Sequence, residues 1–173
     1  MDYVSHYPSP LGPITLSSDG TALTGLWFDG QKYDRATLSE DRAEKSLPIF
    51  DDAHAWLDAY FQGQDPGPTP PLAPRGTPFQ KAVWDILLTI PRGSTLTYGD
   101  IGAQLAQVMG RAHMSAQAVG GAVGHNPISL MIPCHRVVGT GGSLTGYAGG
   151  VDKKQKLLLL EGVDVFRFTL PEL

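Results

Sequence analysis

The chain has 173 residues, of which 42% are hydrophobic and 9% aromatic, and it contains one cysteine. This length suits one ordinary domain or two small ones, and the composition is that of a soluble globular protein. There is no run of about 18 apolar residues, and the start Met1-Asp2-Tyr3 lacks a basic, apolar leader, so we expect neither a membrane span nor a signal peptide. One cysteine excludes an internal disulfide and a multi-cysteine zinc site, and we expect a cytoplasmic protein without a metal centre.

Charge is divided unevenly along the chain, whose formal net charge is −4. Residues 1–74 carry four basic and eleven acidic side chains, a net charge of −7, whereas residues 75–173 carry nine basic and six acidic ones, a net charge of +3. A nucleic-acid-binding surface, if the chain has one, therefore belongs to the second part. An excess of three positive charges is also typical of an ordinary solvated surface.

The first part of the chain predicts strands followed by one helix. Residues 13–18 and 22–28 are apolar runs bounded by glycine-containing turns, which favours an antiparallel hairpin. Apolar residues recur at helical spacing over residues 50–61. Residues 62–78 then hold six of the fourteen prolines, so we expect an interdomain connection there rather than a helix.

The second part predicts three helices with well-marked starts. The first begins at Thr77-Pro78, with Gln80 completing a capping box, and its apolar face runs to Ile90. A second helix begins at Thr97 and extends to about Gln107, and Ser115 caps a third over residues 116–123. This spacing fits a helix-turn-helix, whose last helix would lie on DNA, although most groups of three short helices are simply packed together.

The third predicted helix is rich in glycine, which lowers helix propensity, and in alanine, whose small side chain leaves the backbone uncovered. Something must approach its backbone closely. The approaching surface is either another helix or a nucleic-acid groove.

The only cysteine, Cys134, lies in the run Pro133-Cys134-His135-Arg136-Val137. A lone cysteine is more often a small buried apolar residue than a nucleophile. In a turn set by Pro133, however, Cys134 and His135 can share one side. The histidines near it match no metal motif.

This run, preceded by Asn126-Pro127 and followed by Gly146-Tyr147-Ala148-Gly149-Gly150, resembles the O6-alkylguanine-DNA alkyltransferase family. The similarity extends from about Thr77 to Gly162 and more weakly back to Pro10. The resemblance implies a mixed α/β (α+β) fold. An N-terminal ribonuclease-H-like domain of sheet and helix would span residues 1–74, and a helical C-terminal domain with a helix-turn-helix would span residues 75–173.

The resemblance also implies a mechanism. Cys134 would take an alkyl group from guanine O6, His135 would accept the thiol proton through a water, and Glu161 would orient His135. We expect Glu161 late in a helix capped by Asp152, where a carboxylate opposes the helix dipole unless a partner holds it. Asn126 would fix the turn before the cysteine. Tyr98, which can also be a plain helix start, would donate a proton to the departing guanine.

The substrate pocket implied by the family uses main-chain and side-chain groups. The Val137 carbonyl would accept from the guanine amino group, and the Ala148 N–H would lie near O6. Tyr147 would wall the pocket and Gly149 would leave it roomy, within a glycine-rich lid over residues 139–150.

The partner implied by the family is double-stranded DNA with an alkylated guanine, bound by a monomer through its backbone and minor groove with the base flipped out. Ser115, Arg111 and Arg136 are expected to contribute, although Arg136 can instead be structural. The family usually has arginine in the third helix where this chain has Gln117. Gln117 carries no charge and stacks less well, so we expect weaker flipping or a changed lesion preference.

Three functional hypotheses follow. The first is irreversible, stoichiometric transfer of the alkyl group to Cys134, with no cofactor because the sequence has no dinucleotide fingerprint, P-loop or acidic metal cluster. It leaves activity on O4-alkylthymine open. The second is a lesion-recognition protein that flips the base without transfer, against which the presence of Cys134 counts. The third is a cysteine hydrolase using Cys134 and His135, which lacks a recognisable oxyanion arrangement.

Overall fold

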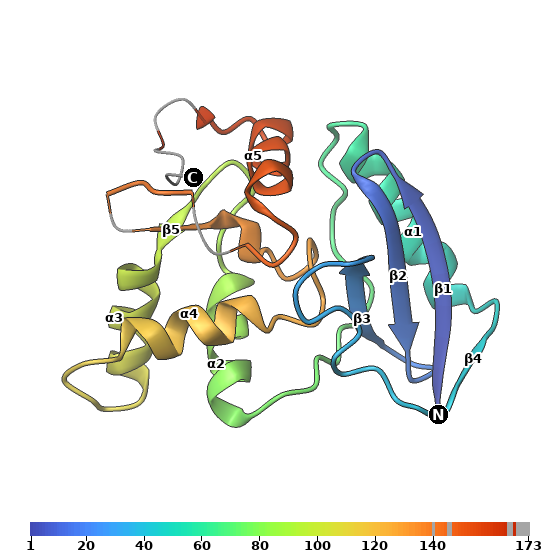
Figure 1. The fold of residues 1–173 in the computed structure, drawn as a ribbon, viewed down its shortest axis with the longest axis horizontal. Helices are drawn as coiled ribbons and strands as arrows, with labels where there is room; N and C mark the ends of the chain where they lie inside the picture. Colours follow the sequence, from blue (N-terminus) through green and yellow to red (C-terminus); the bar gives the residue numbers. More distant parts are fainter. Residues whose placement is uncertain (140, 145–146, 166–167, 169–173) are drawn as a thin grey trace. The chain divides into compact units, whose positions relative to one another are not determined.

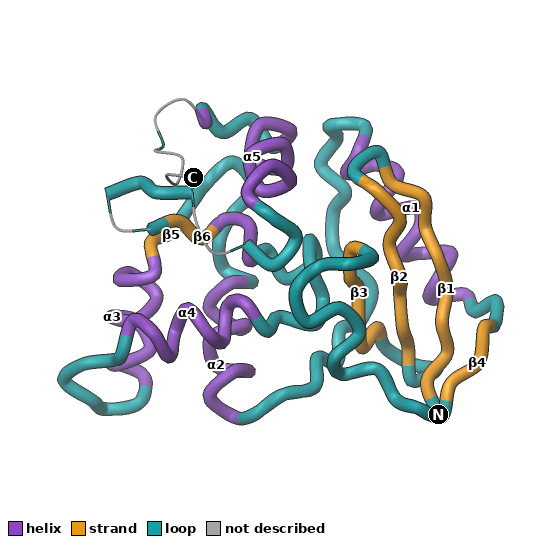
Figure 2. The backbone as a smooth tube through the Cα atoms, viewed as in Figure 1, coloured by secondary structure: helices purple, strands orange, loops and turns teal. Residues whose placement is uncertain are grey.

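The structure, a computed structural model, describes residues 1–139, 141–144, 147–165 and 168. These form two compact units. The first contains Met1–Arg75 together with Pro127–Met131, and the second contains Gly76–Asn126 and the chain from Ile132 on. Most strands lie in the first unit and most helices in the second (Figure 1, Figure 2), which confirms the predicted mixed α+β class.

The first unit is built on a four-stranded sheet with the order β3-β2-β1-β4. The predicted hairpin is confirmed: β2 (Gly12–Ser18) and β3 (Leu23–Phe28) are antiparallel, with Leu16 opposite Leu26. The sequence analysis missed β1 (Asp2–Ser9), which is antiparallel to β2, and β4 (Arg42–Glu44), which is parallel to β1. β4 is short and exposed, and β1 mixes polar residues with Val4 and two tyrosines, so neither has the apolar run by which a strand is recognised.

The free edge of β3 is covered by two segments that are distant in sequence. The Leu23 N–H donates to Pro71 O at 2.8 Å, and the Ala73 N–H donates to Leu23 O at 2.8 Å. Further along the strand, the Leu26 N–H donates to Pro127 O at 2.8 Å and Leu26 O accepts from Ser129 at 2.9 Å. These bonds satisfy backbone groups that an exposed edge would leave open to other chains.

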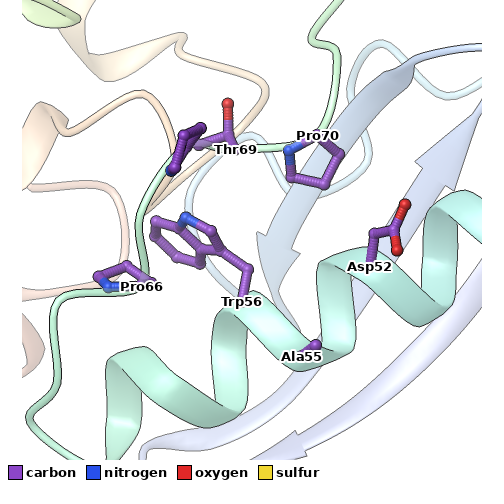
Figure 3. A pocket seen from close by; sticks show the side chains of 7 residues that line it. Asp52, Ala55, Trp56, Pro66, Thr69 and Pro70 are labelled. Carbon is purple, nitrogen blue, oxygen red and sulfur yellow. The ribbon is translucent and has the colours of Figure 1, made fainter.

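Helix α1 (Pro48–Phe61) lies along the sheet of the first unit (Figure 1) and confirms the helix expected over residues 50–61. Its buried residues recur at helical spacing: Ile49, Phe50, Ala53, Trp56, Leu57 and Tyr60. The proline-rich stretch that follows has no helix, as predicted. Its prolines surround the Trp56 ring in a groove (Figure 3), and the indole N–H of Trp56 donates to Gly67 O at 3.1 Å.

An ion pair between a buried carboxylate and a partly exposed guanidinium fixes the start of β1 to the end of this stretch. Both Asp2 carboxylate oxygens accept from Arg75 at 2.6 Å, and Oδ2 also accepts from the Ser39 N–H at 2.9 Å. Asp2 is fully buried. The Arg75 hydrogen bonds outweigh burial and hold the pKa of Asp2 below its usual value.

The second unit contains the three predicted helices α2 (Pro78–Leu87), α3 (Tyr98–Val108) and α4 (Ala116–Gly124). Thr77 and Thr97 each form a complete capping box, and the Ser115 hydroxyl accepts from the Ala118 N–H at 3.2 Å. All three predicted starts are therefore confirmed. The Trp84 indole N–H donates to Ala122 O at 2.9 Å and ties α2 to α4.

The remaining elements of this unit surround the cysteine. They are β5 (Leu96–Thr97) parallel to β6 (Val137–Val138), the 3-10 turn η1 (Cys134–Arg136) and helix α5 (Val151–Leu160). The expected Asp152 cap is wrong. The N-cap is Gly150 at φ 99°, a conformation that glycine adopts readily, and Asp152 lies in the first turn instead. Across the described ranges, no helix is long and apolar enough to cross a bilayer.

Candidate active site

Cys134 is held at the start of a tight turn. The Cys134 N–H donates to Ile132 O at 2.8 Å, and Pro133 has φ −81° and ψ 65°, the geometry of an inverse γ-turn. The 3-10 turn η1 follows at once, so Cys134 and His135 are both buried, at 5% and 0% exposure. The Pro133 turn therefore leads directly into a segment in which both side chains are buried.

Asn126 closes the loop before the cysteine. Its side-chain N–H donates to Ile132 O at 2.7 Å, and it also hydrogen-bonds to the Cys134 thiol. Asn126 is 4% exposed, so these contacts are sheltered from water. The asparagine thereby sets both the path of the backbone and the surroundings of the sulfur.

His135 and Glu161 form a fully buried hydrogen-bonded pair, with Nε2 and Oε2 2.6 Å apart. Burial lowers the pKa of His135 despite the pull of Glu161, so the imidazole is neutral at physiological pH. We assign the Nε2 proton to the bond with Glu161, which makes Nδ1 the acceptor nitrogen of the ring. This tautomer suits a base that takes a proton from elsewhere.

Arg136 holds the other oxygen of Glu161. Its Nε donates to Oε1 at 2.7 Å, and its Nη1 donates to Ile90 O at 2.7 Å. Burial alone would raise the pKa of Glu161, but His135 and Arg136 outweigh it and keep the carboxylate ionised. With 13% of its side chain exposed, Arg136 supports the structural alternative rather than the expected DNA contact. Glu161 caps the C-terminal end of α5, just beyond its last helical residue.

The environment of Cys134 favours the neutral thiol in the resting protein. Burial raises the thiol pKa, while the Asn126 hydrogen bond, the charge of Lys154 and the N–H groups of Cys134 and His135 work in the opposite direction. The same four groups stabilise a thiolate once it forms. A nearby base is therefore more important here than a lowered resting pKa.

Tyr98, Val137 and Tyr147 lie around this network. Tyr98 is the first residue of α3, and burial, together with the negative charge of Cys134 once it is ionised, raises the pKa of Tyr98 to about 12, so it stays protonated. Val137 follows η1 in the fully buried strand β6. The Tyr147 ring meets the His135 ring edge-on, with centroids 6.4 Å apart.

A glycine at position 149 is required by the space around it. A Cβ at this position would lie 2.7 Å from Tyr147 Cε2, so any larger residue would displace the tyrosine ring. Ala148 beside it is half-buried. Within the expected lid, residues 140, 145 and 146 lie outside the described part of the chain.

Helix α4 presents an open face of small residues. A Cβ added at Gly120, Gly121 or Gly124 would meet nothing within 4 Å. Helix packing therefore does not require these glycines, which removes one of the two explanations that the sequence left open. Gln117 and Ser115 lie exposed at the start of this helix, and Arg111 lies exposed in the turn before it.

Sequence reasoning missed Lys154, which is fully buried in α5. Three lysines fall within four residues of each other in the sequence, and composition does not distinguish them. The burial of Lys154 could have been predicted from its helical spacing, because Leu158 and Glu161 follow it by four and seven residues and lie on the same face of the helix. Among the residues that the structure describes, no group of three or more His, Cys, Asp or Glu side chains has the arrangement of a metal site.

Comparison with known families supports this picture over nearly the whole chain. Residues 3–73 match the ribonuclease-like domain of 6-O-methylguanine DNA methyltransferase, and residues 78–163 match its DNA-binding domain. The methylated-DNA–protein-cysteine methyltransferase of Mycobacterium bovis is 44% identical over 153 residues, 88% of each chain. The Haemophilus influenzae protein of the same name is 38% identical over 93% of this chain and 87% of its own.

Solved structures of similar proteins have folds that match this chain over most of its length. The crystal structure of Mycobacterium tuberculosis OGT in complex with DNA has a TM-score of 0.80 at 40% identity and covers 96% of this chain and 94% of its own. The O6-methylguanine DNA methyltransferase of Methanococcus jannaschii has a TM-score of 0.64 at 26% identity and covers 98% of this chain and 99% of its own. The chain therefore belongs to the methylated-DNA–protein-cysteine methyltransferase family.

Proposed function

We propose that this protein repairs O6-alkylguanine in DNA by moving the alkyl group irreversibly to Cys134, so that each molecule acts once. The observation that carries the proposal is a sole cysteine, buried beside a neutral histidine that a buried glutamate orients. The family to which the chain belongs supplies the reaction class.

In the proposed reaction His135 Nδ1 takes the proton of the Cys134 thiol through a bridging water. The thiolate attacks the alkyl carbon, an S–C bond forms, and the C–O6 bond breaks with its electron pair passing to the guanine. Tyr98, protonated at physiological pH, donates a proton to the departing base. The thioether is chemically stable, and none of the residues described around Cys134 offers a route to reverse it.

The guanine is proposed to lie between main-chain groups of two segments. The Val137 carbonyl accepts from its amino group, and the Ala148 N–H donates near O6. Tyr147 closes one side of the pocket. Its ring can lie there because Gly149 has no side chain that would collide with the ring. O4-alkylthymine is a further possible substrate of the same thiolate.

DNA binding is assigned to the proposed C-terminal domain, residues 75–173. The open glycine face of α4 supports insertion into the minor groove, with the base flipped out and with phosphate contacts from Ser115 and Arg111. Gln117 would fill the space that the base leaves. We further propose that the protein acts as a monomer in the cytoplasm, where Cys134 stays reduced.

The test is intact-protein mass spectrometry after incubation with duplex DNA containing O6-methylguanine. We expect the mass to rise by one methylene, with the label mapped to Cys134, and no change for Cys134→Ala or Cys134→Ser. Tight binding to lesion DNA without a mass change would instead identify a lesion-recognition protein. Release of a product with repeated turnover would identify a hydrolase.

A further inference from the structure

The connection between α3 and α4 is longer than a helix-turn-helix requires. Residues 109–115 separate the two helices, whereas a turn of roughly three or four residues is usual. The connection projects as a loop past the N-terminal end of α4 (Figure 1), and it borders a hollow of about 320 Å³ beside α3. Every residue from 107 to 113 is exposed, including the apolar Val108 at 78% and Met109 at 40%. The extra length therefore presents a surface to solvent.

Both ends of this connection are fixed. Helix α3 ends in a Schellman motif around Gly110, whose φ of 66° is the left-handed conformation that such an ending needs. One hydrogen bond of the motif joins the Arg111 N–H to Ala106 O at 2.8 Å. At the other end Met114 is buried. Residues 108–113, called the turn segment from here on, are therefore both exposed and anchored at each end.

The sequence around the turn segment has the charge of a nucleic-acid interface. No aspartate or glutamate occurs between Asp100 and Asp152. The lysine and arginine residues of that stretch are Arg111 and Arg136 alone, and Arg136 is bound to Glu161. Helix α4 itself contains no charged residue. Positive charge that attracts phosphates to α4 must therefore come from outside the helix, and Arg111 is the nearest source along the chain.

We propose that the turn segment is a second DNA-contacting element, which holds the duplex beside the groove that α4 occupies. Arg111 and the imidazole of His113 bind backbone phosphates. Val108 and Met109 lie in the groove, where apolar side chains of minor-groove-binding proteins press against the base steps. This role rests on the proposed function, because it takes α4 as the helix that binds DNA. It makes the contacted stretch of duplex longer than α4 alone could cover.

Fluorescence anisotropy with unmodified duplex DNA, repeated over a range of salt concentrations, separates the two kinds of contact. Arg111→Gln should weaken binding about three- to tenfold and reduce the salt slope of the binding constant by roughly one, because one phosphate contact is lost. Adding His113→Ala to it should weaken binding further. The double variant Val108→Ser/Met109→Ser should weaken binding by about the same factor at every salt concentration, because it removes no charge.

Each kind of change has a matched control at an exposed position of α5. Lys156→Gln removes a charge of the same sign, and Leu159→Ser removes an apolar side chain that is 57% exposed. Both controls should bind DNA like the wild type, and all variants should unfold at a temperature close to that of the wild type because only exposed side chains change. Wild-type affinity in both turn variants would overturn the proposal, as would equal losses in the two controls.

A different occupant of the apolar tip gives a different result. Dimers of the wild type in analytical ultracentrifugation that are lost in Val108→Ser/Met109→Ser, with DNA affinity unchanged, would assign the tip to a second copy of the chain and overturn the proposal.

Failure of this proposal is distinguishable from failure of the proposed function. Alkyl transfer by the wild type, together with unaltered DNA binding in the turn variants, refutes the role of the turn segment alone. A wild type that binds DNA through the turn segment but never accepts an alkyl group refutes the transfer and leaves the DNA contact in place.

Discussion

At the scale of single residues, a change at Glu161 should affect the most properties of the protein, because its one carboxylate accepts hydrogen bonds from two side chains. Its Oε2 orients the imidazole of His135, and its Oε1 neutralises Arg136. The side chain is fully buried, so water cannot replace either contact. The reactivity of Cys134 and the stability of the second unit should therefore both depend on this one side chain.

Replacing Glu161 with glutamine tests that dependence. Glu161→Gln keeps the shape but leaves Arg136 without its buried counter-charge, and we expect a loss of about 3 kcal/mol in the free energy of unfolding. Alkyl transfer should slow by roughly 10- to 100-fold because His135 loses its orienting acceptor. Urea unfolding and single-turnover transfer measure the two effects, with exposed Glu40→Gln as the control. A variant as stable and as fast as the wild type would contradict both roles.

At the scale of elements, α4 joins a buried face to an open one. Val119, Ala122 and Val123 are buried against the unit, whereas the glycines at 120, 121 and 124 face open space. The protein thus accepts weak helix formers where its own packing does not need them. The proposed insertion of this helix into a DNA groove would account for that choice.

Substitutions at Gly121 should separate folding from DNA binding. Gly121→Ala is expected to raise the free energy of unfolding by up to about 1 kcal/mol, because alanine favours the helix and its Cβ meets nothing. Gly121→Leu should fold equally well yet weaken binding to lesion duplex by at least roughly tenfold, since its side chain would hold the helix away from the groove. Thermal unfolding and fluorescence anisotropy measure the two properties. Full affinity in Gly121→Leu would rule out α4 as the groove-binding helix.

Gln117, exposed near the start of the same helix, tests how the flipped base is replaced. Gln117→Arg adds a planar charged group that stacks better than an amide, so we expect faster repair of alkylated duplex. Gln62→Arg, a charge-matched change at an exposed position in the first unit, should have no such effect. An unchanged rate in Gln117→Arg would refute the proposed part of this position in flipping.

Local signals account for what the sequence predicted about the elements. Capping residues at Thr77, Thr97 and Ser115 act on the next three residues, so all three helix starts were readable. The start of α5 could not be predicted, because the N-cap residue Gly150 has no capping side chain and Asp152, two residues later, is of a type that often caps helices. The burial of Lys154 was also missed, since it depends on how α5 packs against η1.

At the scale of the whole molecule, the unpredicted features are contacts between distant parts of the chain. Residues 127–131 lie just before the reactive segment, yet they hydrogen-bond to β3 and belong to the first unit. The pairing of Asp2 with Arg75 likewise joins residues 73 positions apart. No local pattern encodes such partners, whereas the residues proposed for the site come from the family resemblance.

The Asp2–Arg75 pair should make stability depend on pH. The folded pKa of Asp2 lies below its ordinary value of 3.8, so its contribution is complete above that pH and is lost as the pH falls through the folded value. Asp2→Asn should therefore cost about 2 kcal/mol at pH 7, moderated by the partial exposure of Arg75, and progressively less below pH 3.8. Urea unfolding at several pH values checks this, and a cost that does not change with pH would contradict it.

Cys134 is proposed to accept one alkyl group and then to be unable to react again. The most direct test is to count methyl groups transferred per protein molecule at the end point with excess O6-methylguanine duplex, and to map them by peptide mass spectrometry. We expect one methyl group per molecule, located on Cys134, and no further repair after fresh DNA is added. Continued repair by the same molecules, or a methyl group on any other residue, would contradict it.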